Sequence, residues 1–473
     1  MRTTLVFFDD YWLDFKSGIK RSWIKPIEIS SYEDPNFPLV TYPSLEWCPE
    51  VQRYRVWYDA VYDLNKNNSR YLCMAESVDG INWKSSCYHN QDSVNQIYPH
   101  CVYSGKGGVS GGSVFRDEYE TDPMKRYKYV GSIGIDYQKN KQPRQFPLSM
   151  LHSSDGVNWH ESNKIVYPYT SDTYNRFFYN PVMNKYQVLM RGGYIDRRIC
   201  TITSEKENYS FPQLLLHPDP GEEENGYAIQ YYGMGTRWNA GMFLGLLMRF
   251  HTCMTDSDLK KMNGYMDTEL VYSYDGICWM HTNRQPLVER SLSPNFGFNQ
   301  LYLLDMTSCV EDESVLLVGV AARNPHLRGE EYLKWQQNDQ QKLTRLNFYK
   351  IRKDGFCALD CCGKGGRMIT KTFLLESADM TLNVAALSGN FTLSILNAEG
   401  DVYPGFSAQD FSIQQFDAVS AVPHWKNHSL HELVGKRIRF CMDFSSASFY
   451  SLTADIRPCI AYPQQSISRP QHN

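Results

Sequence analysis

Apolar residues in this chain occur in short runs that either alternate with polar residues or stay apolar for several positions. Alternation with a period of two indicates a strand with one buried face, and a short continuous apolar run indicates a strand buried on both faces. The pattern therefore predicts an all-β chain, with its clearest strands in residues 51–63, 125–135, 184–194, 240–250 and 313–323. Helical periodicity is clearest in residues 255–266 and 330–343, which we expect to form short excursions between strands.

A short phrase, Ser-x-Asp-Gly-x-x-Trp, recurs along the chain. It is complete at Ser77–Trp83, Ser153–Trp159 and Ser273–Trp279, and weaker copies stand at Thr203–Tyr209 and Arg352–Phe356. Asp-Gly is a strong hairpin signal because tight turns need a residue with positive φ, which glycine adopts at no steric cost. Each copy follows a strand-like run, so we interpret it as the turn between the last two strands of a four-stranded sheet.

The number of copies predicts the architecture of the longer part of the chain. Five copies separated by roughly 50 to 80 residues indicate five four-stranded blades, because long internal repeats of this kind are typical of propellers. If the phrase were only a turn motif, its copies would not each follow a strand-like run. We therefore predict a five-bladed β-propeller over residues 1–360.

The composition changes after Arg352–Phe356. Residues 361–367 are rich in glycine, and residues 372–387, 389–406 and 435–452 read as alternating strands. This segment predicts a compact β-sandwich over residues 366–455, followed by a polar tail over residues 456–473.

Charge and cysteine content exclude several classes of protein. The formal net charge is −4 and no basic run stands out, which argues against nucleic acid as a partner. No stretch approaches the roughly 20 apolar residues of a membrane helix. The 13 cysteines contain no CxxC pair, so we expect no metal site, no cofactor and a reducing compartment. Two aspartates follow the short run Leu5–Phe8, unlike a signal peptide, and we expect a cytoplasmic protein unless a leader has been removed.

The repeated phrases resemble those of five-bladed propeller glycosidases, namely the fructan hydrolase (invertase and levanase) family and the arabinanase/xylosidase family. A closer resemblance covers nearly the whole chain and is to bacterial proteins identified as distant relatives of the fructan hydrolase N-terminal domain. It is carried by residues 6–12, 43–47, 53–60, 75–83, 113–131, 171–181, 353–356, 368–407 and 424–444. The resemblance implies a propeller fold and a carbohydrate as substrate, and fold by itself does not decide activity.

The resemblance also implies a set of acids on the innermost strands of the first three blades. The family uses one nucleophile, one transition-state stabiliser in an Arg-Asp-Pro motif and one general acid/base. Here Arg116-Asp117 matches the second motif, with Glu118 in place of the proline, so Asp117 is the expected stabiliser. Glu46 stands near the position of the nucleophile, without the family's Asn-Asp-Pro-Asn-Gly, and Asp172 near that of the acid/base, without Glu-Cys-Pro.

Each of these acids also has an alternative interpretation. Asp117 could cap a turn beside two arginines, Asp172 could form an Asx turn, and Glu46 could be a general base or only a hydroxyl ligand instead of the nucleophile. Glycosidic cleavage needs two carboxyl groups flanking the bond, so the three acids must lie close together if they are catalytic.

Further residues could line the same site. Arg116 is an expected substrate ligand, and Arg191, with Arg197 and Arg198, could bind a hydroxyl pair or an acidic sugar, although pairing with nearby acids is the alternative. Aromatic side chains stack on sugar rings, and Trp47, Tyr231 and Trp238 are the candidates for a stacking wall. Asp267 and Glu269 are a reserve pair of carboxylates.

Two functions follow from this pattern. The first is a glycoside hydrolase, or a transglycosylase, acting on a furanoside or short oligosaccharide at the propeller mouth through Glu46, Asp117 and Asp172. The second is a propeller that binds carbohydrate without catalysis, which carboxylates too far apart to flank one bond would favour. A homodimer through the C-terminal module is an arrangement that the sequence leaves open.

Overall fold

The computed structural model describes residues 2–61, 70–88, 97–105, 108–134, 147–192, 197–205, 208–219, 223–224, 227–252, 264–293, 295–323, 342–361 and 365–459. Within these ranges the chain forms β-strands and short 3-10 helices, Pro123–Lys125 and Leu430–Leu433, and no α-helix, which confirms the all-β prediction. No described helix is both long and apolar enough to cross a bilayer. The two segments expected to be helical fall largely on residues 253–263 and 324–341, outside the described residues.

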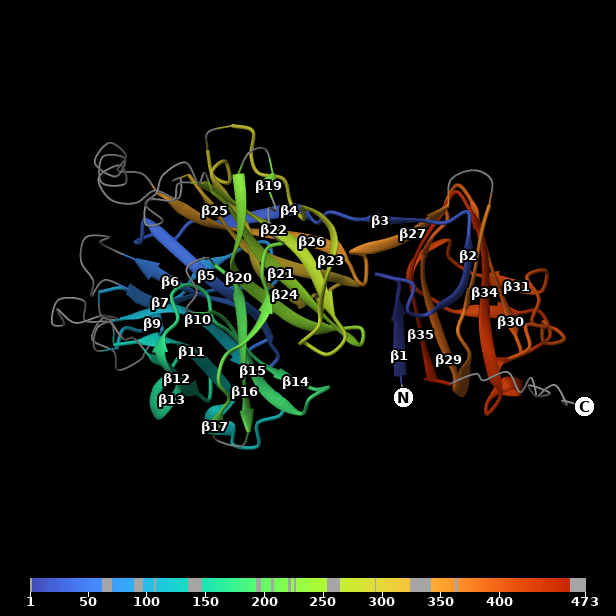
Figure 1. Ribbon diagram of the computed structural model, residues 1–473, viewed down its shortest axis with the longest axis horizontal. Helices are drawn as coiled ribbons and strands as arrows, with labels where there is room; N and C mark the ends of the chain where they lie inside the picture. Colours follow the sequence, from blue (N-terminus) through green and yellow to red (C-terminus); the bar gives the residue numbers. More distant parts are fainter. Residues whose placement is uncertain are drawn as a thin grey trace, which may run out of the picture. The chain divides into compact units, whose positions relative to one another are not determined.

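The chain divides into two compact units, Lys25–Ile351 and a second unit made of Met1–Ile24 with Arg352–Asn473. The N-terminal strands pair with C-terminal ones, as the blue and orange-red strands of Figure 1 show: β1 (Arg2–Val6) with β35 (Ala447–Pro458), β2 (Leu13–Ser17) with β28 (Gly366–Thr370), and β3 (Lys20–Trp23) with β27 (Cys357–Cys361). The division thus differs from the predicted boundaries, because backbone pairing assigns the first 24 residues to the C-terminal unit.

The unit Lys25–Ile351 is built from antiparallel meanders, in which strands adjacent in sequence pair with each other. The first contains β5 (Leu39–Cys48), β6 (Arg53–Val61), β7 (Arg70–Ser77) and β8 (Lys84–Ser85), with β9 (Cys101–Tyr103) also on β7. The second contains β10 (Val109–Arg116), β11 (Tyr127–Ile133), β12 (Pro147–Ser153) and β13 (His160–Thr170). The third contains β14 (Arg176–Asn180), β15 (Lys185–Arg191), β16 (Ile199–Glu205) and β17 (Asn208–Tyr209), with β18 (Gln213–Leu216) also on β16.

A longer sheet completes this unit. It contains β19 (Glu223–Glu224), β20 (Tyr227–Asn239), β21 (Met242–Thr252), β22 (Gly264–Ser273) and β23 (Trp279–Pro286), and then β24 (Gln300–Ser308), β25 (Ser314–Ala322), β26 (Thr344–Arg352) and β4 (Ile27–Tyr32). A single parallel bridge, Met266–Gln300, joins its two halves. The outermost strand, β4, comes from the N-terminal side and pairs with β26. The predicted turn Arg352–Phe356 therefore leads into β27 of the other unit instead of a fourth strand here.

The three complete copies of the repeated phrase adopt one local structure. In the second copy, Asp155 accepts hydrogen bonds from the backbone N–H groups of Val157 and Asn158, both at 2.8 Å, and Trp159 Nε1 donates to Gly156 O at 3.1 Å. Gly156 has φ +74°, the left-handed conformation that favours glycine. The copies centred on Asp79 and Asp275 repeat these bonds, which confirms the phrase as a structural turn.

Buried polar side chains connect the first strands of the first three meanders. Ser44 Oγ on β5 accepts from Val114 N on β10 at 2.9 Å, and Ser113 Oγ on β10 accepts from Phe177 N on β14 at 2.9 Å. Neither serine is more than 1% exposed, so these bonds replace water for backbone groups that have no partner within their own sheet.

The connection continues through an ion pair. Arg176 on β14 donates from Nε to Thr236 O on β20 at 3.1 Å and from Nη1 to Asp305 Oδ2 on β24 at 3.0 Å. Asp305 Oδ2 also accepts from Leu45 N on β5 at 3.0 Å, which returns to the first meander. The first strands β5, β10, β14, β20 and β24 thus form a closed ring of neighbours.

Successive contacts show that neighbouring ring strands run in the same direction. Asn175 N donates to Gly111 O at 2.7 Å, and two residues later along both strands Phe177 N donates to Ser113 Oγ. We call the side on which these strands begin the start face, marked by Tyr42, Gly111, Thr173, Tyr232 and Tyr302. We call the opposite side the end face, marked by the last residues of the same strands.

The C-terminal unit contains two groups of paired strands. One has the order β2, β28, β34 (Arg437–Ser445) and β30 (Asn390–Leu396), and the other β3, β27, β35, β29 (Phe373–Ala385) and β32 (Asp417–Ala421). β29 and β34 are joined through Phe373 and Leu374, while β31 (Phe411–Ile413) pairs with β33 (Pro423–Trp425). Their buried apolar side chains form one core, which includes Leu393, Phe440 and Phe449.

The ring makes a prediction about stability. Asp305→Ala should lower the free energy of unfolding by about 3–5 kcal/mol, because it leaves the Arg176 guanidinium buried without its charge partner. The matched control is Asp312→Ala, which removes an exposed partner of Lys350 and should cost less than about 1 kcal/mol. Denaturant unfolding of both variants measures the difference, and equal losses would contradict the role of the ring.

Candidate functional site

The structure does not bring the three predicted acids together. Asp172 precedes β14 and lies at the start face. Glu46 lies two residues before the end of β5, and Asp117 directly follows the last residue of β10, so both lie toward the end face. Because the ring strands run in one direction, the length of a strand separates Asp172 from the other two acids.

Glu46 belongs to the charge network of the ring. Its carboxylate accepts from Arg237 Nη1 at 3.0 and 3.1 Å, and Arg237 Nη2 lies 3.6 Å from Asp305. Burial raises the pKa of Glu46 against the opposing effect of Arg237, and the nearby Asp305 raises it further. The contacts of Glu46 with Arg237 and of Arg237 with Asp305 join β5, β20 and β24. Because its pKa is raised, the buried Glu46 carboxyl group binds its proton more tightly than an exposed glutamate does.

Asp117 is fully buried and is held from three sides. It accepts from Lys128 Nζ at 2.6 Å, from the backbone N–H of Tyr119 at 3.0 Å and from the hydroxyl of Tyr186. These contacts match the turn-capping interpretation of this residue. They also make it the link between β10, β11 and β15.

The other predicted ligands are dispersed as well. Arg116 pairs with Glu50 and Glu118 at the end face. Trp47 packs against Tyr54, and Trp238, which is 37% exposed, packs against Phe243. Both tryptophans lie near the ends of their strands, whereas Tyr231 is buried in an apolar cluster formed by the third meander and the β20–β23 part of the longer sheet.

The start face combines strained backbone with aromatic side chains. Tyr42 and Thr173 have φ angles of 53° and 91°, and Gly111 has φ 66°, so three adjacent ring strands have a left-handed residue in or just before their first few residues at this face. Positive φ is rare for residues other than glycine and concentrates at functional sites. A Cβ on Gly111 would lie 1.9 Å from Thr173 O, which shows how closely these entries pack.

Asp172 and Arg191 form the polar centre of the start face. Their side chains are paired, with the aspartate 66% and the arginine 13% exposed. The Arg191 guanidinium lies 5.3 Å from the ring centroid of Tyr232, and Arg197 lies 5.1 Å from the same ring, so one tyrosine contacts two cations. Arg191 Nη1 is buried and has no hydrogen-bond partner among the described residues.

Asp59 lies beside these entries and was not singled out by sequence analysis. It pairs across the sheet with Thr41, and its carboxyl group accepts from Gly111 N at 2.7 Å. Burial raises its pKa to about 7, although the bond from Gly111 lowers it. This carboxyl group therefore carries a proton over much of the acidic to neutral range.

The reserve carboxylates on β22 are occupied. Asp267 accepts from Arg249 at 2.8 and 3.0 Å and from His251 Nε2 at 2.9 Å, and Glu269 lies 2.8 Å from His281 Nδ1. Burial works to raise the pKa of Asp267, but the contacts with His251 and Arg249 hold it below its usual value. Asp267 is satisfied within its own sheet, which fits a structural role, whereas Oε2 of Glu269 is buried without a hydrogen-bond partner among the described residues, 3.9 Å from Arg249 Nη1.

A buried group in the first meander has the donor types of a metal site. The ligand atoms of Cys73, His100 and Cys101 lie within 4.8 Å of one another, and His100 Nε2 lies 3.0 Å from Asp34 Oδ2. The two sulfur atoms are 2.8 Å apart, closer than the roughly 3.8 Å expected for two thiolates on one tetrahedral zinc with 2.3 Å bonds. The group as it stands does not fit a zinc ion.

One signal in the sequence points to the buried Asp34 beside His100, whereas the position of Tyr232 has no such signal. Asp34-Pro35-Asn36 repeats the Asp-Pro-Asn core of the fructan hydrolase motif that is missing around Glu46. The tyrosine beside Arg191 and Arg197 at the start face is Tyr232, because a β-bulge between Tyr231 and Gly233 shifts the register by one residue. A strict period of two cannot reveal such a bulge.

No family model matches the chain, and no curated protein matches it. Solved structures to which it is similar include the fructofuranosidase from Schwanniomyces occidentalis complexed with fructose, at 12% identity and TM-score 0.41, covering 92% of this chain and 97% of that one. A thermostable family-43 glycoside hydrolase is similar at 11% identity and TM-score 0.45, and the match covers 69% of this chain and 95% of that one. The α-L-arabinofuranosidase from Lactobacillus brevis is similar at 10% identity and TM-score 0.42, and the match covers 68% of this chain and 94% of that one.

The raised pKa of Asp59 predicts a pH dependence of stability. Between about pH 4 and pH 7 the folded chain keeps a proton on Asp59 that the unfolded chain releases, so the free energy of unfolding falls as pH rises. Asp59→Asn cannot ionise. The Tm of this variant relative to the parent should therefore increase from about pH 4 to about pH 8 in thermal unfolding.

Asp79→Asn provides a control of opposite sign. Hydrogen bonds from Asn82 and Ile81 hold the pKa of Asp79 below its usual value, so its stabilisation is present at neutral pH and lost in acid. The loss of Tm in this variant relative to the parent should therefore become smaller as pH falls. Parallel pH profiles for the two variants would contradict the environment described for Asp59.

Proposed function

We propose that the unit Lys25–Ile351 is a five-bladed β-propeller. Counting the long sheet as two meanders, on either side of its single bridge, gives five. The turns support a ring, because each packs on the preceding meander: Trp57 Nε1 donates to Gly156 O at 2.8 Å and Gln187 Nε2 to Gly276 O at 2.9 Å. Gly80 of the first meander likewise packs on Leu316 of the last one.

For the C-terminal unit we propose a β-sandwich. The argument is that its two groups of strands, joined at β29 and β34, enclose one apolar core. A sheet buries an apolar face against another layer, and two layers around one core are the simplest arrangement for a unit of this size.

We further propose that the chain binds a carbohydrate at the start face. The observation that carries this proposal is the exposed Asp172 paired with Arg191, whose guanidinium lies over the ring of Tyr232. A carboxylate and a guanidinium side by side can accept from and donate to neighbouring sugar hydroxyls, and an aromatic ring supplies an apolar surface for the sugar face. The resemblance of the repeats to propeller glycosidases supplies the ligand class, a furanoside or short oligosaccharide.

The separation of the predicted acids favours binding over the three-acid hydrolase. Hydrolysis needs carboxyl groups on both sides of one glycosidic bond. Glu46 and Asp117 lie toward the end face, and each is held by a basic side chain.

Hydrolysis remains a second candidate through a different pair of acids. Asp172 is exposed beside a guanidinium, whereas Asp59 is buried with a pKa of about 7. When their environments give two carboxyl groups different pKa values, the one with the raised pKa can act as the general acid while the other stays ionised. In this mechanism Asp172 would be the ionised partner and Asp59 the proton donor, which requires the residues that cover the fully buried Asp59 to move aside for the substrate.

The binding proposal predicts which substitutions matter. Arg191→Met and Asp172→Asn should each weaken binding of fructo- or arabino-oligosaccharides by about tenfold or more, since each removes charge-assisted hydrogen bonds. Isothermal titration calorimetry measures the effect. Arg116→Met and Glu46→Gln are the matched variants at the end face and should bind like the parent. If only the end-face variants lost binding, the binding site would lie at the end face and the proposal would be wrong.

The hydrolytic candidate predicts a pH profile. If Asp59 donates the proton, turnover of aryl furanosides should fall as pH rises through about 7, because the carboxyl group then ionises. Asp172→Asn should abolish turnover. Binding without any turnover of these substrates would eliminate this candidate and leave the binding proposal intact.

A further inference from the structure

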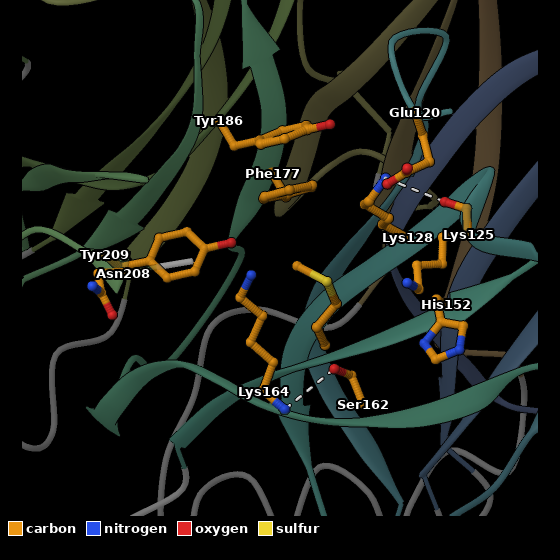
Figure 2. A pocket seen from close by; sticks show the side chains of 11 residues that line it. Glu120, Lys125, Lys128, His152, Ser162, Lys164, Phe177, Tyr186, Asn208 and Tyr209 are labelled. Atoms are coloured by element: carbon orange, nitrogen blue, oxygen red, sulfur yellow. Dashed lines mark hydrogen bonds and ion pairs between the residues drawn. The ribbon is translucent and has the colours of Figure 1, made fainter. Parts of the chain in front are cut away.

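A cavity of about 550 Å³ lies between the second and third meanders, away from the start-face residues. Its walls come from β11, β12 and β13 on one side and from β14, β15 and β17 on the other (Figure 2). The volume falls within the range of roughly 300–1,000 Å³ that is typical of small-molecule sites.

Aromatic rings form one side of this cavity. Phe177 and Tyr186 are stacked, with centroids 5.3 Å apart and an interplanar angle of 13°, and Tyr209 lies at the edge of the third meander. Tyr186 is fixed because its hydroxyl donates to the buried Asp117. Rigid aromatic faces of this kind suit the apolar face of a sugar ring.

Cations form the other side. The Nζ of Lys128 lies 2.6 Å from Asp117 and 3.0 Å from Glu120, and Lys125 pairs with Asp122 at 3.1 Å. Lys164 makes no ion pair among the described residues. Its Nζ lies 5.8 Å from the ring centroid of Tyr209, and Figure 2 shows its side chain pointing into the cavity.

The lining contains three lysines and one glutamate, so positive charge exceeds negative charge within it. The charges of Lys125 and Lys128 are balanced by the acids with which they pair, so these two lysines add little net positive charge to the cavity. The ammonium group of Lys164 therefore dominates the field inside the cavity. An anion at this position would pair with Lys164, because the three donors of Lys128 are already taken by Asp117, Glu120 and Lys125 O.

We propose that this cavity binds an anionic saccharide, a sugar ring that carries a carboxylate or a phosphate. The sugar ring stacks on Tyr186 and Tyr209, and the acidic group binds Lys164. This site is separate from the start face, and it requires no catalysis. It makes the propeller a protein with two carbohydrate sites of different charge preference.

The test uses the full chain with D-glucuronate, glucose 6-phosphate, glucose and inorganic phosphate as probes, by ligand-observed NMR and calorimetry. Both acidic sugars should bind, and glucose should bind at least about tenfold more weakly, as expected for the loss of one charge-assisted contact. Lys164→Met should weaken both acidic sugars by about tenfold, and Tyr209→Ala should weaken all the sugars. Lys84→Met, which removes an exposed lysine outside the cavity, is the matched control and should bind like the parent.

Several results would overturn the proposal. They are equal binding of glucose and glucuronate, no binding of either acidic sugar at millimolar concentration, and unchanged affinity in Lys164→Met with a parental Tm. Inorganic phosphate that binds as tightly as glucose 6-phosphate would reduce the cavity to an anion site and reject the saccharide. The Arg191→Met variant distinguishes this site from the start face, because the cavity should keep its affinity in that background.

Discussion

The buried ion pair between Arg176 and Asp305 is the interaction on which the longer unit depends. Arg176 reaches from β14 to β20 and β24, and Asp305 also accepts a backbone hydrogen bond from β5. Serine side chains make the remaining connections, between β5 and β10 and between β10 and β14. Each bond satisfies a buried polar group that its own sheet cannot satisfy, so the meanders are held as a ring.

This ring also decides where chemistry can occur. Because its strands run in one direction, residues at strand beginnings gather on one face and residues at strand ends on the other. The left-handed residues Tyr42 and Thr173, the pair Asp172–Arg191 and Tyr232 all lie at the start face. Glu46 serves the ring itself through Arg237, and Asp117 supports the wall of the lysine cavity through Lys128 and Tyr186.

Sequence pattern predicted the strands and their turns well, because a Ser-x-Asp-Gly-x-x-Trp phrase encodes its own hydrogen bonds. It could not reveal that β4 completes the last meander or that β1 to β3 join the C-terminal strands, since long-range pairing leaves no local signal. Of the predicted site, Asp172 and Arg191 meet at the start face. Glu46 and Asp172 follow from spacing to the next strand and Asp117 from a motif match, and neither signal says at which end of a strand a residue stands.

The central claim is that carbohydrate binds where the ring strands begin. A crystal structure of the chain with a bound furanoside oligosaccharide tests it most directly. The account predicts sugar hydroxyls in contact with Asp172 and Arg191 and a sugar face on Tyr232. A ligand bound at the end face, beside Glu46 and Trp47, would contradict it.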